Sequence, residues 1–266
     1  MADALALYAR LIGARIRADW QYRVSFALFT LGQVMATVLD LLAIAVIFGH
    51  TTALAGWSYW EVLFLYGVTG LSFGAADLFA SPVDYAWVHV RRGTFDQFLI
   101  RPAGALFQLA CDGFALRRAG RLIQPSVILA VAAGRVGADW TVARALFLAT
   151  TVACGTAIFA ALWVLTTSVA FWAVEAREVF NSVTDGGGFF SQYPLDVLAP
   201  AARRLALIVP LAFVNYLPVT WIIGRPDGLG LPGWARFLAP AVAVALCGAA
   251  ALAWRAGLRH YRSTGS

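Results

Sequence analysis

The sequence predicts an all-α integral membrane protein with six transmembrane helices, and three observations lead to this fold class. Hydrophobic residues make up 61% of the 266 residues, and the mean hydropathy is +0.75. Charged residues make up only 13%, compared with about 25% in soluble domains. The apolar residues are gathered into stretches long enough to cross the ~30 Å hydrocarbon core of a bilayer. We therefore expect a single transmembrane domain over residues 1–266.

The net charge of +6 indicates a membrane surface as the partner of the basic residues. All 20 basic residues are arginine, and most lie beside apolar stretches, where they attract anionic lipid headgroups. Membrane lipid, and not nucleic acid, is therefore the expected partner. The three cysteines (Cys111, Cys154 and Cys247) are widely separated, without metal-ligand spacing, so we expect buried thiols and no metal site.

Residues 1–23 predict an amphipathic helix that lies on the membrane surface. Its apolar residues recur at helical spacing: Leu5, Tyr8, Ile12, Ile16 and Trp20. A charged lead-in to the first span is the alternative. The first long apolar run begins only near Val24 and is longer than the 7–15 residues, roughly, of a secretory signal, so we expect no cleavable signal.

The first two spans are predicted at residues 24–48 and 61–80. At about 1.5 Å per residue, the first crosses the hydrocarbon core with room to tilt. The loop 49–60 between them contains no arginine. Three of its aromatic residues predict a cluster at the membrane interface: Trp57, Tyr59 and Trp60.

A short cytoplasmic helix is predicted within residues 91–102, between the second and third spans. Thr94 and Gln97 have the spacing of a capping box, and Asp96 falls in the first turn, where a negative charge suits the helix dipole. Pro102 disfavours helical geometry at the preceding residue and so ends the helix. The pattern predicts about two turns of helix with defined ends.

This short helix is expected to have an apolar face between basic flanks. Phe95, Phe98 and Leu99 are three and four residues apart and share one face. Gly93 frees the backbone to turn into the helix. These properties predict a docking element for another protein, and a loop helix that adheres to lipid is the alternative.

The third and fourth spans are predicted at residues 114–134 and 144–172. Three arginines near the start of the third span are expected to reach the inner headgroup layer: Arg117, Arg118 and Arg121. Pro125 predicts a kink in this helix. The last span is predicted at residues 237–254.

The fifth span has two alternatives. Hydropathy favours residues 205–224. In the other version the fifth span is a polar helix at about 177–193, and residues 194–231 enter the outer leaflet and return without crossing. Prolines and the glycine run 186–188 favour this re-entrant backbone, which is tolerated only where protein shields it or where it lines a cavity.

The distribution of arginine predicts the orientation. In the first version 16 of the 20 arginines lie on the side of the two termini, and in the second version 14 do. Because arginine and lysine accumulate in cytoplasmic loops, both versions place the termini and residues 91–102 in the cytoplasm.

Two stretches resemble the ABC-2 type exporter permeases, especially the small six-span branch that is found beside separate ATPase subunits. The first lies between the second and third spans and reads Arg92-Gly93-x-x-Asp96-x-x-Leu99-x-Arg101-Pro102. The second precedes the last span and reads Tyr193-Pro194-Leu195 … Arg203-Arg204 … Ile208-Val209-Pro210 … Pro218. With the amphipathic N-terminus and the number of spans, the resemblance covers nearly the whole chain.

The resemblance implies a coupling helix, an outer gate and protein partners. The coupling helix would contact an ATPase through Arg92, Gly93, Thr94, Phe95, Asp96, Phe98, Leu99, Arg101 and Pro102. The outer gate would be formed at Pro194, Pro210, Asn215 and Pro218. Two permease chains, identical or sister, would pair in the cell membrane of a bacterium, with two copies of the ATPase beneath them.

The chain itself has no ATP-binding motif. It lacks the P-loop sequence, and it has no lysine at all, so ATP and Mg²⁺ are expected in the partner ATPase and no cofactor in this chain. No serine or cysteine has a nucleophile context, which argues against an enzyme. The resemblance implies outward transport of a hydrophobic or amphipathic substrate. The alternative is a proton-coupled secondary transporter that uses Asp40 or Asp77.

Polar and small residues within the spans are further candidates. Asp40 and Asp77 can carry protons or meet a cationic substrate, since a carboxylate within the membrane is functional by default, but an interhelical hydrogen bond is the alternative. Three glycines of the second span allow close helix approach and predict a permease–permease interface: Gly67, Gly70 and Gly74. Asn215 can satisfy broken backbone at the gate, or it is simply one polar residue in a loop.

Overall fold

The computed structural model describes residues 23–84, 86–102, 104–112, 118, 120–169, 171–172 and 186–261, and every regular element in them is helical. The α-helices are α2 (Arg23–His50), α3 (Tyr59–Asp84), α4 (Ala86–Arg91), α5 (Asp96–Leu99), α6 (Ala105–Asp112), α7 (Gly120–Ala133), α8 (Val142–Val169), α10 (Pro200–Ile208), α11 (Tyr216–Ile222) and α12 (Ala239–His260). The 3-10 helices are η2 (Leu195–Val197), η3 (Leu211–Phe213) and η4 (Gly233–Phe237). The all-α fold class is confirmed for this part of the chain, whereas the interfacial helix expected at 1–23 falls almost entirely outside it.

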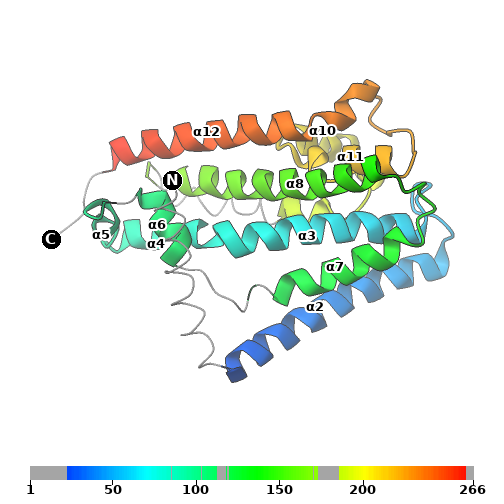
Figure 1. The fold of residues 1–266 in the computed structure, drawn as a ribbon, viewed down its shortest axis with the longest axis horizontal. Coiled ribbons are helices and arrows are strands. Elements are labelled where there is room, and N and C mark those ends of the chain that lie inside the picture. The colour runs from blue at the N-terminus through cyan, green and yellow to red at the C-terminus, as the bar shows by residue number, and fades with distance from the viewer. Residues whose placement is uncertain are drawn as a thin grey trace.

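Three long helices form the centre of the molecule. α3, α8 and α12 run along its long axis, and α8 packs against both of the others (Figure 1). α7 packs against α3, and α2 contacts α7. The short helices α4, α5 and α6 gather at one end of the bundle, called here the α5 end, whereas α10 and α11 lie toward the other, the α11 end.

Three helices of the described residues are long and apolar enough to cross a membrane: α3 over Tyr59–Ala80, α8 and α12. They coincide with the second, fourth and last predicted spans. α10 and the η3–α11 segment form a pair bent by 78°, either a broken span or a re-entrant loop. α2 and α7 contain shorter apolar stretches, Val34–His50 and Gly120–Ala133. The total of six spans stays a prediction, because the start of the third span and most of 177–193 lie outside the described residues.

Three local features differ from the sequence-based expectations. α3 continues past residue 80 to Asp84 and includes Pro82, which is tolerated because neighbouring protein buries it. α6 is an additional helix, and its eight residues are too few to give a hydropathy signal. The predicted interfacial role of Trp57 is wrong: its side chain is buried in the core and donates a hydrogen bond to Asp196.

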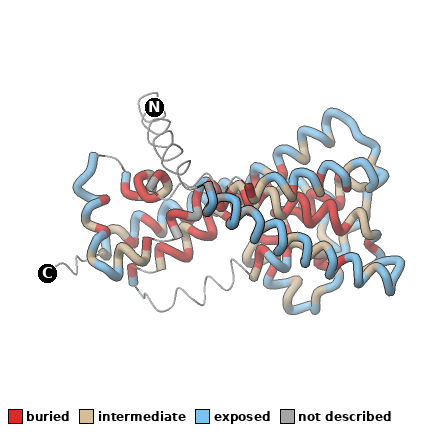
Figure 2. The backbone as a smooth tube through the Cα atoms, turned by 90° about the horizontal axis from the view of Figure 1, so that it is seen from below, coloured by how far each residue is buried: buried red, intermediate tan, exposed pale blue. Residues whose placement is uncertain are grey.

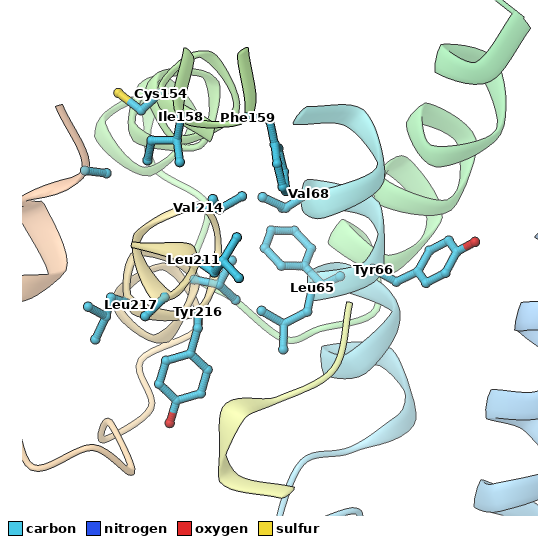
Figure 3. Close-up of a cluster of buried hydrophobic side chains, with 14 of the residues drawn as sticks. Leu65, Tyr66, Val68, Cys154, Ile158, Phe159, Leu211, Val214, Tyr216 and Leu217 are labelled. Carbon is cyan, nitrogen blue, oxygen red and sulfur yellow. The ribbon is translucent and has the colours of Figure 1, made fainter. Parts of the chain in front are cut away.

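Buried apolar residues form two clusters. The larger one joins α3, α8 and the η3–α11 segment, where side chains such as Val68, Phe159, Leu211 and Val214 converge (Figure 3). The smaller one lies at the α5 end between α4, α5, α6 and the C-terminal part of α12. Figure 2 shows buried residues toward both ends of the molecule. The segment 91–102 therefore belongs to a packed region of its own.

α3 and α7 approach closely because α3 presents three glycines to α7. A Cβ on Gly67 would lie 2.8 Å from the Cβ of Leu129, and a Cβ on Gly70 would lie 2.9 Å from the Cβ of Pro125. A Cβ on Gly74 would also meet α7, at 3.2 Å. A helix of the same chain thus fills the glycine face, so these glycines serve packing within the chain, and the contribution of this span to a permease–permease interface stays a prediction.

Replacing Gly67 by valine is expected to lower the free energy of unfolding by about 1–3 kcal/mol, because the new side chain overlaps α7. The measurement is the unfolding of the purified chain in detergent micelles. Gly32→Val on α2 is the matched control, since a Cβ there would meet no described atom within 4 Å. Equal stability of the two variants would contradict the close contact between α3 and α7.

Candidate functional site

The segment 91–102 forms a turn followed by a short helix at the α5 end. Gly93 has a φ of +68°, in the left-handed region that glycine adopts without strain, and this turns the chain after α4. α5 then covers only four residues, Asp96–Leu99. The Nδ1 atom of His89 and the hydroxyl oxygen of Thr94 lie 3.0 Å apart, which ties the end of α4 to the start of the segment.

The predicted capping box does not form in this helix. The residue that precedes α5 is Phe95, and no side-chain cap bond is present. The Thr94 hydroxyl lies one residue too early and pairs with His89 instead. The helix has about one turn rather than two, since the hydroxyl that would hold its first turn is used elsewhere.

The aromatic residues of the segment face inward. Phe95 is 0% exposed and Phe98 is 2% exposed. The ring centroid of Phe95 lies 5.1 Å from that of Tyr261, 5.4 Å from Phe171 and 6.2 Å from Trp254. We call these last three side chains the aromatic socket. Phe171 follows the end of α8, whereas Trp254 and Tyr261 belong to the C-terminal part of α12 and its end, so Phe95 connects the segment to both long helices.

Close packing holds the aromatic socket together. The ring centroids of Phe171 and Trp254 are 5.3 Å apart. A Cβ on Gly257 would lie 2.4 Å from Phe171, so only glycine at this position lets α12 approach that ring. Gln108 on α6 donates a hydrogen bond from Nε2 to the carbonyl oxygen of Phe98 at 2.9 Å. The segment is thus fixed from α6, α8 and α12 together.

The outward-facing part of the segment is a short tip. Leu99 is 46% exposed and Ile100 is 83% exposed. The exposed tip consists of four consecutive residues: Leu99, Ile100, Arg101 and Pro102. The prediction that Phe95, Phe98 and Leu99 form one docking face is therefore wrong, because the chain buries the two rings in its own core and leaves only Leu99 of the three exposed.

Asp96 lies beside the aromatic socket. Burial raises the pKa of the Tyr261 hydroxyl above its ordinary value, and the neighbouring Asp96 carboxylate raises it further. The hydroxyl therefore stays protonated at neutral pH. Arg91 and Arg92 are exposed, so the segment presents cations to the outside while Asp96 is only partly exposed.

The bent segment before α12 contains the three prolines that were predicted at the outer gate. Each borders or enters a short helix: Pro194 before η2, Pro210 before η3 and Pro218 within α11. The break of 78° lies between α10 and the η3–α11 segment, around the second of these prolines. A proline removes a backbone donor and cannot continue the preceding helix, which explains the break there. Their role as a gate stays a prediction.

Asn215 lies near this break and donates a hydrogen bond to a backbone carbonyl outside it, so its role at a gate stays a prediction. Its Nδ2 donates to the carbonyl oxygen of Ser191 and to the hydroxyl of Thr69 on α3, the latter at 2.5 Å. The Thr69 hydroxyl donates to the same carbonyl at 2.8 Å. All three residues are buried, so α3, the turn at 191 and the bent segment share one polar junction.

Asp196 organises a second polar group at the α11 end and is absent from the residues predicted for this region. Its carboxylate accepts hydrogen bonds from Trp57 Nε1 at 2.7 Å and from the Tyr216 hydroxyl at 2.8 Å. The amide of Gly228 donates to that hydroxyl, and a Cβ on Gly228 would lie 1.6 Å from Asp196 Oδ1. An acidic residue directly after the Tyr193-Pro194-Leu195 match was the available signal.

Asp77 forms an interhelical ion pair rather than standing alone in the membrane. Arg121 Nη1 on α7 lies 2.6 Å from Asp77 Oδ2 on α3, and Asp77 is buried. The structure therefore favours the interhelical alternative for this carboxylate. Arg121, expected to reach the headgroup layer, is directed to α3 instead because a buried carboxylate is within its reach.

Asp40 lies at a polar cavity of about 260 Å³ between α2, α3 and α7. The Tyr66 hydroxyl donates to Asp40 Oδ2 at 3.2 Å, and the Thr37 hydroxyl donates to Oε1 of Gln124. Gly70, Gly74, Arg121 and Gln192 also line this cavity. We call it the α2–α3–α7 pocket. Gln124, next to Pro125 in a predicted span, was the overlooked polar signal.

No group of three or more His, Cys, Asp or Glu side chains in the described residues is arranged to hold a metal ion. A family model described as ABC-2 family transporter protein matches residues 34–265. No curated protein and no solved structure matches the chain. The family match spans all of the sites described above.

Proposed function

The chain belongs to the ABC-2 transporter family and is a membrane permease of an ABC transporter, and from this premise we propose that it is the transmembrane subunit of an ATP-driven exporter. Its energy comes from a separate ABC ATPase, which the family implies as a partner. The sequence contains no P-loop and no lysine, which supports ATP and Mg²⁺ binding in that partner. Two permease chains, identical or sister, pair above two ATPase copies.

One observation supports the proposed coupling role: the tip of the segment 91–102 is exposed, whereas Phe95 anchors the same segment in the aromatic socket. The tip offers Ile100 and Arg101 to a partner, while Phe95 is enclosed by the aromatic socket. Packed cores are not continuously deformable, so a push on the tip displaces the socket and the attached helices as one body. Closure of the ATPases on ATP thereby moves the ends of α8 and α12.

The arginine distribution supports the orientation of this assembly. In the topology that places the bent segment outside, 14 of the 20 arginines lie on the side of the α5 end, Arg91, Arg92 and Arg101 among them, and six lie toward the α11 end. By the positive-inside rule the α5 end faces the cytoplasm, together with both termini. The bent segment at the α11 end then lies toward the outside, where it forms the outer gate of the export pathway in a bacterial cell membrane.

Family membership favours this function over proton-coupled secondary transport. The ion pair between Asp77 and Arg121 supports a structural role for Asp77. Asp40 stays a candidate binding residue, because it lines the α2–α3–α7 pocket and accepts a hydrogen bond only from Tyr66 among the described residues.

Removing the side chains of the tip is expected to uncouple the transporter. The variant Ile100→Ala/Arg101→Ala loses one apolar and one charged contact, and we expect its affinity for the ATPase to fall roughly thirty-fold, or about 2 kcal/mol. The measurement is co-purification and transport with the partner ABC ATPase. The control is Arg135→Ala, which removes an exposed arginine that lies two residues after α7 and outside the segment 91–102. Wild-type binding and transport by the double variant would refute the coupling role.

A further inference from the structure

The carboxylate of Asp40 lies deep within a membrane-facing helix. It is ten residues before the end of α2 at His50, or about 15 Å along the helix axis. A carboxylate at such a depth is costly unless it has a functional partner. Tyr66, its hydrogen-bond donor, points away from the other labelled side chains of the core cluster (Figure 3). The structure thus places the ionisable Asp40 side chain at the α2–α3–α7 pocket, outside the buried core cluster.

The charges around this pocket do not cancel. Arg121 lines the pocket, but its guanidinium is 2.6 Å from the Asp77 carboxylate, so these two charges offset each other. No ion pair involves Asp40 among the residues that the structure describes. The lining itself contains one carboxylate, Asp40, and one guanidinium, Arg121; with Asp77, which pairs with Arg121 from outside the lining, the three charges sum to −1, and this attracts a cation and repels an anion.

The other polar atoms of the pocket add acceptors to this charge. The Oε1 atom of Gln192 is buried and has no hydrogen-bond partner in the described part of the chain. The Oε1 atom of Gln124 accepts from Thr37 and has a second lone pair. Together with Asp40, these amide oxygens provide three acceptors in one cavity. A primary ammonium group has three donors and no acceptor, and it matches such a set.

We propose that the α2–α3–α7 pocket binds a ligand with a protonated primary amine, with Asp40 as its counter-ion. The proposal rests on the proposed transport function and deepens it, since the amine is then the head group of an amphipathic cargo. The rings of Phe73 and Pro125 line the same pocket and accommodate the apolar part next to the amine. A carboxylate or phosphate ligand would face Asp40 at close range, and an alcohol would leave its charge unbalanced.

The test measures binding of a small amine to the full chain in phosphatidylcholine nanodiscs at neutral pH, without ATPase or ATP. The probes are benzylamine, benzyl alcohol and benzoate, titrated by calorimetry against empty nanodiscs. We expect saturable binding of benzylamine, with the other two at least about ten-fold weaker, and a similar loss of benzylamine binding in Asp40→Asn. Asp40→Glu keeps the charge and should keep most of the affinity.

Asp139→Asn is the matched control, because it makes the same chemical change at an exposed carboxylate of the loop before α8. If Asp40→Asn does not fold, the order of the three probes on the unmodified chain decides. The proposal is overturned if no probe binds saturably, if benzyl alcohol or benzoate binds as tightly as the amine, or if Asp40→Asn binds the amine unchanged. Since no nucleotide is present, such a failure leaves the coupling experiment with Ile100 and Arg101 unaffected.

Discussion

Phe95→Ala is expected to lower the free energy of unfolding by about 3–5 kcal/mol, the usual cost of emptying a buried phenylalanine site. The ring is fully buried and lies within reach of Phe171, Trp254 and Tyr261. Its loss leaves a cavity where the segment 91–102 packs against Phe171, which follows α8, and against Trp254 and Tyr261 at the end of α12. We therefore also expect ATP hydrolysis to continue without transport, although the exposed tip is unchanged.

Two measurements separate these effects. Unfolding in detergent micelles, followed by tryptophan fluorescence, reports the stability and the environment of Trp254. Transport and ATP hydrolysis by the reconstituted complex report coupling. Phe79→Ala on α3 is the matched control, because its ring is half-exposed and should cost far less. Wild-type stability and coupling in Phe95→Ala would show that the contact between Phe95 and the aromatic socket does not anchor the segment 91–102.

Asp77→Ala is expected to cost about 2–4 kcal/mol of stability, because it leaves a guanidinium in the helix interface without its carboxylate. The expected loss of stability is smaller than for a wholly buried ion pair, because 31% of the Arg121 side chain is exposed. The measurement is again unfolding in detergent. Asp139→Ala is the control: its 3.8 Å pair with Arg144 is on the surface and should contribute less than about 1 kcal/mol.

A double variant decides what the Asp77–Arg121 pair does. Asp77→Leu/Arg121→Leu removes both charges together and should recover most of the lost stability, since an apolar pair can replace a buried ion pair. If the pair is only structural, transport returns with stability. If Asp77 carries protons, the double variant stays inactive although it is stable, and the secondary-transport alternative regains support.

For the segment 91–102, local sequence patterns predict the position in the fold but not the contacts. Its position between two spans and its exposed basic residues follow from the order of apolar and charged stretches, and the structure places it at one end of the bundle as expected. Its contacts do not follow from that order. Helical spacing groups Phe95 with Leu99, yet the first is buried and the second exposed, because rings contributed by α8 and α12 occupy one side of the segment.

The glycines of α3 and the carboxylates of the spans show the same limit. Spacing indicates that Gly67, Gly70 and Gly74 admit a neighbouring helix, but it does not say which helix, and α7 of the same chain fills that face. Their positions within predicted spans make Asp40 and Asp77 equally strong candidates for a functional carboxylate. Only the placement of Arg121 separates them, by neutralising one and leaving the other at the α2–α3–α7 pocket.

The sequence by itself therefore determined the membrane class, the positions of the long apolar helices and the family motif, because burial in lipid depends on the summed hydropathy of contiguous residues. The tertiary structure alone decided which side chains meet: Phe95 with the aromatic socket, Asp77 with Arg121, and Trp57 with Asp196. These pairs are far apart along the chain. Their contact is set by how the helices are rotated and packed against one another, which no local pattern specifies.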